Sequence, residues 1–295
     1  MDNILEVSQI CKTFKNTEFA LSDISFNLPR GVIMGLIGEN GSGKTTTLNI
    51  ILGLLKADSG GVKVFGNAFN MDDIKAKEKI GVVFDGNCFP GEFTPRDVSK
   101  IYANIYKKWD AAYFFQLLKT FDVDEKVVVR KMSHGTKATL AIITALAQKP
   151  ELLVLDEPTG GIDPVRREDM LDLFLDFISN GQNSIIFSSH ITGDIEKIAD
   201  YVTFINRGKM LFSAEKDVFL YKYGIIRCGQ EDFELLVKEN KINILQYVKR
   251  DYQYRILVDD QSKIDAKLSE SAVQENPTLE EIMYLIAKGE MGELL

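Results

Sequence analysis

The sequence contains little histidine and little cysteine, which narrows the chemistry it can carry. Its 295 residues include two histidines and three cysteines, Cys11, Cys88 and Cys228. The cysteines are far apart, no C-x-x-C spacing occurs, and any disulfide would leave one thiol over. We therefore expect reduced thiols in a cytosolic protein.

Long apolar runs and a targeting segment are also missing. No stretch of about 18 consecutive apolar residues occurs, which is the length that a membrane-spanning helix needs. The first residues, MDNILEVSQI, lack the basic and apolar regions of a signal peptide. Any membrane role should therefore come from a partner protein.

The chain has no excess of positive charge. It carries 43 acidic against 35 basic residues and a net charge of −8, which disfavours a broad nucleic-acid-binding surface. We expect no nucleic acid partner. The apolar fraction of 45% is typical of folded proteins, and the length suits one large domain or a large domain with a small companion.

The chain opens with strand patterns that lead into a glycine-rich loop. Residues 4–10 and 22–28 alternate between apolar and polar side chains, and 31–38 form a denser apolar run. This pattern favours edge strands beside a buried strand. Glycines and then a helical stretch follow in ENGSGKTTTLNIILGLL, residues 39–55. A strand, a glycine loop and a helix, in that order, are what a phosphate site needs.

Helical and strand patterns then alternate along the middle of the chain. The expected elements are a helical stretch over 94–121, helices over 133–149, 164–179 and 192–199, strands over 151–157 and 183–190, and a hairpin that turns at 206–208. The alternation predicts a mainly parallel sheet covered by helices. Aromatic side chains recur over 94–121, and plain helical packing is the simplest interpretation of them.

The pattern changes from about Tyr221 onward. A strand over 224–229, a helix over 231–240, two strands that meet near Arg250 and Asp251, and a last helix over 279–288 follow one another. We expect a small α+β appendage, in which no functional motif is recognisable.

The glycine loop carries a phosphate-binding motif. GENGSGKT, residues 38–45, fits G-x-x-x-x-G-K-[ST], in which backbone N–H groups cradle phosphates. The lysine of the motif, Lys44, reaches the β and γ oxygens, and the hydroxyl of Thr45 meets Mg²⁺. The residues expected to bind a nucleoside triphosphate here are Gly38, Glu39, Asn40, Gly41, Ser42, Gly43, Lys44, Thr45 and Thr46.

Two carboxylates supply a second half of this site. Asp156 and Glu157 follow four apolar residues in LLVLDEP. Asp156 can hold Mg²⁺, and Glu157 stands one residue closer to the γ-phosphate. A carboxylate at that place can polarise the attacking water.

The order of these motifs resembles the ATP-binding cassette ATPases. The phosphate loop, MSHGTK, LLVLDEPTGGID and IIFSSH follow with that family's spacing, and the resemblance covers residues 1–220. A GTPase should carry an Asn-Lys-x-Asp base reader, which the sequence lacks. The resemblance implies an α/β P-loop NTPase fold: a mainly parallel core sheet, an antiparallel β subdomain and a helical subdomain over about 86–150. The C-terminal α+β domain would then span 221–295.

The resemblance also assigns residues to a shared ATP site. MSHGT stands where the family has its LSGGQ signature, so Ser133 and Gly135 would contact the γ-phosphate of ATP held by an opposing subunit. A helix N-terminus suits such an anion. His134 and Thr136 depart from the family's glycine and glutamine. Ser133 could equally act as the cap of its helix.

Other residues are assigned by the same resemblance. His190 matches the switch histidine at the γ-phosphate, and Asp163 matches a loop that lines the dimer interface, although it could also cap the next helix. Phe14 stands where an aromatic ring stacks on adenine. Asp85 takes the place of the family's usual glutamine, which contacts Mg²⁺ and links the nucleotide to the membrane partner.

The resemblance implies an ATPase that uses ATP and Mg²⁺ and pairs with a second cassette, either identical or a paralogue. Its motion would pass to an integral membrane permease, which places the chain in the cytoplasm, peripheral on the inner face of the membrane. Bacterial exporters of drugs, bacteriocins and peptides are the most similar class. The alternatives are a soluble cassette acting as a switch, and a regulatory subunit that hydrolyses ATP weakly.

Overall fold

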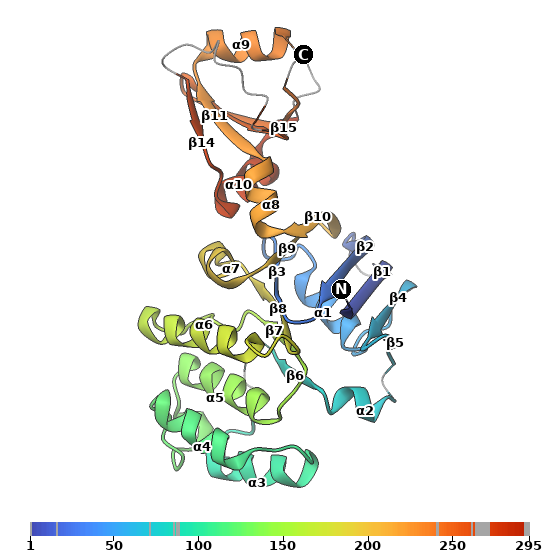
Figure 1. Ribbon diagram of the computed structural model, residues 1–295, viewed down its shortest axis with the longest axis vertical. Coiled ribbons are helices and arrows are strands. Elements are labelled where there is room, and N and C mark those ends of the chain that lie inside the picture. Colours follow the sequence, from blue (N-terminus) through green and yellow to red (C-terminus); the bar gives the residue numbers. More distant parts are fainter. Residues whose placement is uncertain are drawn as a thin grey trace. The chain divides into compact units, whose positions relative to one another are not determined.

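A computed structural model describes residues 2–15, 17–70, 72–84, 86, 89–239, 242–260, 262 and 272–291. Contacts divide the chain into a first unit, Met1–Ser213, and a second unit, Ala214–Leu295 (Figure 1). The change of sequence pattern near Tyr221 lies a few residues beyond this division. That the second unit is an independent domain stays a prediction.

Parallel strands form the centre of the first unit. Strand β3 lies between β8 and β9, and β7 lies between β8 and β6, all paired in parallel. The strands are β3 (Ile33–Ile37), β6 (Ile80–Val83), β7 (Leu152–Asp156), β8 (Ser184–Ser189) and β9 (Tyr201–Asn206). Every residue of β3, β7 and β8 is buried, which explains their continuous apolar runs. The expected mainly parallel core sheet is confirmed.

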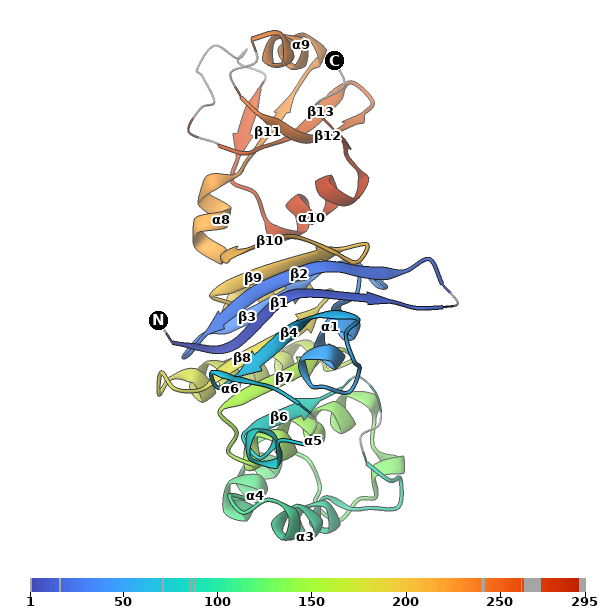
Figure 2. The same ribbon diagram turned by 90° about the vertical axis from the view of Figure 1, so that its right-hand side faces the viewer.

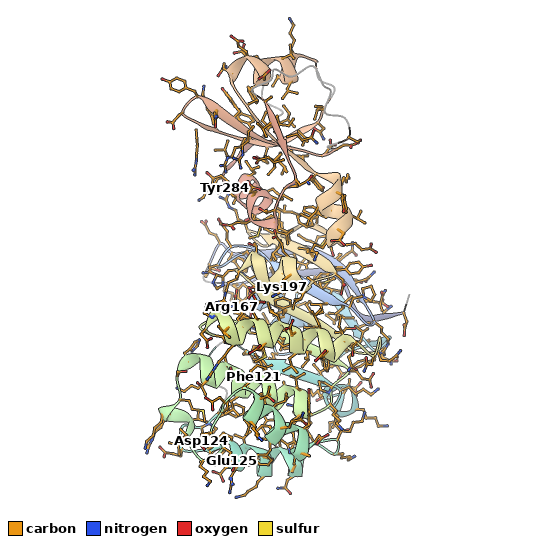
Figure 3. The ribbon with its side chains drawn as sticks, turned by 60° about the vertical axis from the view of Figure 1, so that its left-hand side comes forward. Phe121, Asp124, Glu125, Arg167, Lys197 and Tyr284 are labelled. Carbon is orange, nitrogen blue, oxygen red and sulfur yellow. The ribbon has the colours of Figure 1, made fainter. Side chains whose placement is uncertain are left out.

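Helices cover both faces of these strands. Figure 1 shows α6 and α7 on one side of the strands and α1 on the other, and Figure 2 brings α1 forward. The helices are α1 (Lys44–Ile51), α5 (His134–Ala147), α6 (Pro164–Ile178) and α7 (Thr192–Ile198). Helix α7 packs on β3 and β8, and also on α6. Figure 3 labels Arg167 on α6 and Lys197 on α7, and Lys197 pairs with Glu168 of α6.

Further strands extend the sheet on the far side of β9, and the outer four of them pair antiparallel. The strand order is β5-β4-β1-β2-β10-β9, built from β1 (Asn3–Thr13), β2 (Ala20–Pro29), β4 (Ser59–Val64), β5 (Asn67–Ala68) and β10 (Lys209–Glu215). Strand β10 joins β2 in parallel. The expectation that β1 and β2 are edge strands is wrong, because β1 pairs with both β2 and β4. The alternation of apolar and polar side chains indicates that one face of a strand is buried. It does not indicate whether the strand pairs with one neighbouring strand or with two.

The helical stretch expected over 94–121 contains a break. It holds α3 (Pro95–Ile105) and α4 (Ala111–Thr120). A capping box formed by Thr94 and Asp97 begins α3, and the side chain of Asp110 caps α4. The aromatic side chains pack together: the ring centroid of Trp109 lies 5.4 Å from that of Tyr102 and 5.1 Å from that of Phe114. The expected packing between these aromatic side chains is therefore observed.

The second unit is a small sheet with helices. Its strand order is β14-β11-β13-β12-β15, and its helix α9 packs on β13 while α10 packs on β12 and β13. The strands are β11 (Gly224–Cys228), β12 (Ile244–Arg250), β13 (Gln253–Val258), β14 (Val273–Glu275) and β15 (Glu290–Met291); the helices are α8 (Lys216–Lys222), α9 (Gln230–Glu239) and α10 (Leu279–Lys288). Tyr284 on α10, labelled in Figure 3, accepts a hydrogen bond from Arg250 at 2.6 Å.

The hydropathy of the helices bears on membrane insertion. Within the described residues, no helix is both long enough and apolar enough to cross a membrane.

Candidate functional site

The glycine loop between β3 and α1 wraps around the amine of Lys44. Nζ of Lys44 donates hydrogen bonds to the carbonyl oxygens of Gly38 at 2.8 Å and Glu39 at 3.3 Å. Gly38 has a φ of 155°, and a Cβ there would lie 2.2 Å from the carbonyl oxygen of Ile205. The loop can close this tightly only with glycine at that position.

A cavity of about 600 Å³ lies above this loop. The lining residues are Phe19, Asn40, Gly41, Gly43, Lys44, Thr45, Thr46, Asp156 and Glu157. The fold thus brings the phosphate loop and the acidic pair, separated by more than a hundred residues in the sequence, to one concave surface. Such a cavity, lined by a glycine loop at a helix N-terminus and by one buried lysine, fits a polyphosphate.

Phe19 is a lining residue that the sequence did not single out. The expected adenine-stacking residue, Phe14, is not part of the described lining; its ring centroid lies 6.1 Å from that of Phe19. Both aromatics stand in the segment KTFKNTEFAL, so spacing alone could not choose between them. Glycine at position 43 leaves room for the ring of Phe19, because a Cβ on residue 43 would lie 3.2 Å from Cζ of Phe19.

Asp156 and Glu157 are held by a serine of the neighbouring strand. The Ser188 hydroxyl donates to Asp156 Oδ1 at 2.5 Å, and the Glu157 N–H donates to Ser188 Oγ at 3.0 Å. Asp156 is buried at the end of β7. Glu157 adopts a φ of 49°, a left-handed conformation that side chains rarely take and that often marks a functional site. Ser188 is a second residue that the sequence analysis missed.

The Glu157 carboxylate lies between a cation and a histidine. Its Oε1 lies 3.7 Å from Nζ of Lys44, and its Oε2 lies 2.7 Å from Nδ1 of His190. The N–H of His190 also donates to Oε2 at 3.2 Å. His190 follows β8 and half of its side chain is exposed. Lys44, Glu157 and His190, which are expected to act in catalysis, therefore form one continuous series of contacts.

Burial shapes the charge of the site. Burial lowers the pKa of the Lys44 ammonium from its usual value, and the carboxylates of Glu157 and Asp156 oppose that shift. An anion bound in the cavity would raise the same pKa, because opposite charges favour the protonated amine. The lysine is therefore placed to respond to a negatively charged ligand.

The loop after Glu157 is tied to the helix after His190. The Thr159 hydroxyl donates to Asp194 Oδ2 at 2.7 Å, and both side chains are buried. Thr159 and Asp194 follow Glu157 and His190 at a short distance in the sequence. This hydrogen bond connects the segment that contains Glu157 to the segment that contains His190.

The Ser133 segment and the loop before α6 pack against one another. A Cβ at Gly135 would lie 2.6 Å from the carbonyl oxygen of Gly161, and a Cβ at Gly161 would lie 2.5 Å from Cδ2 of His134. Ser133 caps α5 by accepting from the Thr136 N–H at 3.1 Å. Asp163 caps α6 by accepting from the Arg166 N–H at 3.1 Å.

Ser133 and Asp163 are exposed to solvent, and the described lining of the cavity does not include Ser133, Gly135 or Asp163. The chain by itself therefore does not bring the expected signature residues to its own phosphate loop. That arrangement leaves them open to a second molecule.

The donor set around the cavity suits a hard cation. The Thr45 hydroxyl and the Asp156 carboxylate line the same cavity, and oxygen ligands of this kind are those that Mg²⁺ shares with substrate phosphates. No group of three or more histidine, cysteine or acidic side chains that could hold a metal occurs among the described residues. Thr45 and Asp156 fit a cation that shares its oxygen ligands with a bound phosphate.

One expected residue cannot be placed. Asp85, which stands where the family has glutamine, lies outside the described residues.

Comparison with known proteins gives consistent matches. The ABC transporter family model matches residues 21–160. The ABC transporter ATP-binding protein YtrB of Bacillus subtilis is 31% identical over 88% of this chain and 89% of its own length. The bacitracin transport ATP-binding protein BcrA of Bacillus licheniformis is 33% identical over 72% of this chain and 69% of its own length.

A solved structure, described as the ATP binding subunit of an ABC transporter, shares the fold. It matches with a TM-score of 0.66 at 24% identity, covering 73% of this chain and 91% of its own.

Proposed function

The chain belongs to the ABC transporter ATP-binding proteins, and we propose that it powers the export of a drug, an antimicrobial or an amphipathic peptide through a separate membrane permease. As a member of this family it is an ATPase that binds ATP, and such ATPases dimerise and work with permease subunits. The finer assignments below are our proposal.

The observation that carries the proposal is the connected set of Lys44, Glu157 and His190 beside the cavity. Lys44 binds the β- and γ-phosphates, and Glu157 polarises the water that attacks the γ-phosphate. His190 orients Glu157 through the bond at Oε2. Thr45 and Asp156 hold Mg²⁺, which when bound neutralises charge on the phosphate oxygens.

Two copies, or this chain and a paralogue, close head to tail in this proposal. Ser133 and Gly135 of one subunit contact the γ-phosphate held by the other, and Asp163 lines the same interface. Closure is driven because ATP then binds the closed pair more tightly than the open one, and only such differential affinity shifts an equilibrium. Hydrolysis removes the shared contact and allows the pair to reopen.

An apolar groove beside the helical region is the proposed docking place of the permease. The groove has a volume of about 270 Å³. Its lining residues are Leu52, Leu54, Phe69, Lys77, Ile80, Val82, Phe84 and Tyr106. It lies next in sequence to the segment of Asp85, which would report the state of the nucleotide to the permease. This docking would hold the chain at the cytoplasmic face of the membrane.

The class of cargo is proposed from relatives. BcrA is named for bacitracin transport, and SrtF of Streptococcus pyogenes, 30% identical over 72% of this chain, is named for lantibiotic transport. An export substrate of similar chemistry is therefore the first to test.

Affinity capture tests the proposed partner. The tagged chain is isolated from detergent-solubilised membranes, and co-purifying proteins are identified by mass spectrometry. We expect an integral membrane permease, lost with Leu54→Glu in the groove but kept with Leu211→Glu, which replaces an exposed leucine on β10. Recovery of soluble or nucleic-acid-bound partners, with no permease, would overturn the transport assignment.

A further inference from the structure

Four lysines line a pocket beside the groove. The pocket has a volume of about 310 Å³ and is lined by Lys75, Glu78, Lys79, Tyr106, Lys107, Lys108 and Gln148. We call Lys75, Lys107 and Lys108 the lysine cluster. It joins α2 (Ile74–Lys77) to the segment that follows α3, and both helices lie in the lower part of the first unit in Figure 1. A local excess of positive charge stands out on a chain whose net charge is −8.

The lysine cluster differs from the lysines around it in its ion pairing. No member of the lysine cluster has an ion-pair partner among the described residues, whereas lysines nearby do. Nζ of Lys79 lies 3.0 Å from Glu151, and Nζ of Lys149 lies 2.8 Å from Asp110. Glu78 is the acidic side chain in the lining. Because these three lysines are exposed and form no ion pair with the described residues, their charge is available to an external anion.

Exposed isoleucines accompany the lysines. Ile74 precedes Lys75 and is 69% exposed, and Ile105 precedes Tyr106 and Lys107 and is 61% exposed. Exposed apolar side chains next to lysines form the combination that binds at the surface of a membrane. Lysine is also a point charge on a flexible stem, which suits headgroups at variable positions better than the rigid guanidinium fork of arginine does.

We propose that the lysine cluster, with Ile74 and Ile105, contacts the anionic phosphate headgroups of the membrane. The lysines pair with the headgroups while the isoleucines enter the boundary between headgroups and acyl chains. The surface shares Tyr106 with the groove proposed for the permease, so one orientation of the chain would satisfy both contacts. This contact would align the subunit at the membrane before the permease engages.

Vesicle flotation with the purified full chain tests the proposal without a permease. We expect the parent chain to float with vesicles that contain phosphatidylglycerol, and much less with phosphatidylcholine alone. The variant Lys75→Gln/Lys107→Gln/Lys108→Gln should bind the anionic vesicles about a hundredfold more weakly than the parent chain. Each lysine near the membrane surface contributes a factor of about five at low salt, and the three factors multiply. The control Lys56→Gln/Lys119→Gln/Lys126→Gln, which removes exposed lysines elsewhere, should bind like the parent. Both variants should keep the parent rate of ATP hydrolysis.

Equal binding of the parent to both kinds of vesicle would overturn the proposal, as would parent-like binding by the lysine-cluster variant. If that variant binds vesicles normally but loses the permease in affinity capture, the cluster recognises an acidic segment of the permease instead. If affinity capture with the parent chain recovers no permease, the proposed transport function is contradicted. The vesicle result would still support binding of the lysine cluster to headgroups.

Discussion

Nδ1 of His190 lies 2.7 Å from Oε2 of Glu157. The same oxygen accepts the backbone N–H of His190 at 3.2 Å, so the histidine holds one face of the carboxylate by two contacts. The other oxygen, Oε1, lies 3.7 Å from Nζ of Lys44. The carboxylate proposed to polarise water is thus oriented from both sides, by the residue that follows β8 and by the residue that begins α1.

His190 can be tested as an orienting residue. Replacing it with alanine should lower kcat by about 10²-fold or more, which is in the range of general acid–base effects, with a smaller change in KM. His190→Gln keeps a side-chain N–H that can donate to Glu157 and should retain part of the activity. Steady-state ATP hydrolysis measures both. A His190→Ala variant with the kcat of the parent would contradict the assignment.

Lys44 should control nucleotide binding. Its side chain is buried in the phosphate loop and lines the cavity, so Lys44→Ala removes both the charge and the bonds to Gly38 and Glu39. We expect ATP binding to weaken by at least about tenfold, since a charge-assisted bond contributes about 1.5–3 kcal/mol. Titration with a fluorescent ATP analogue measures this. Lys56→Ala, at an exposed site, should bind like the parent, and equal binding by Lys44→Ala would refute the role.

Capping and trans contact can be separated at Ser133. Aspartate caps helices as well as serine does, so Ser133→Asp should fold with the stability of the parent, whereas Ser133→Ala should lose about 1 kcal/mol. The carboxylate of Ser133→Asp would repel a triphosphate held by an opposing subunit and should prevent ATP-dependent dimerisation. Thermal unfolding and sedimentation velocity report the two effects. Thr278→Asp, at the cap of α10, is the matched control.

Normal ATP-dependent dimerisation of Ser133→Asp would leave Ser133 with a capping role alone. Loss of stability in that variant would instead mean that the serine hydroxyl is required by the fold, through its contact with the Thr136 hydroxyl at 2.8 Å.

Asp58 gives a pH-dependent contribution to stability. Hydrogen bonds from Lys12 and from the N–H and hydroxyl of Thr13 lower the pKa of Asp58 to about 2. In the unfolded chain an aspartate titrates near about 3.9, so its contribution is full above that pH and is lost as pH falls through the folded value. Asp58→Asn should therefore be less stable than the parent at neutral pH, and the difference should shrink below about pH 4. Urea unfolding at several pH values checks this; a constant difference would contradict it.

The periodicity of apolar residues predicted those helices and strands that depend mainly on their own local sequence. The buried strand before Asp156 and the last helix over Leu279–Lys288 stand where apolar runs and spacing placed them. The neighbours of β1, the break between α3 and α4, and the contacts of Ser188 depend on partners distant in sequence. Ser188 and Asp156, for example, stand 32 residues apart and meet because β7 and β8 are adjacent. Periodicity carries no record of such pairing.

The same limit applies to the candidate site. The phosphate-loop motif is contiguous and therefore visible in one segment, and the acidic pair follows a recognisable strand. Phe19 becomes a lining residue only because the chain folds back over Gly43. Asp163 and Ser133 are caps in the structure of one chain, and a role at an interface needs a second chain to become visible.

The shared site is tested most directly by Glu157→Gln. Glutamine keeps the size of the side chain but cannot act as a base, so this variant should bind ATP, fail to hydrolyse it and accumulate as a closed dimer. In sedimentation velocity, the variant should form a dimer when ATP is present and stay monomeric when ATP is absent. A variant that hydrolyses ATP at the parent rate, or that stays monomeric at saturating ATP, would contradict the account.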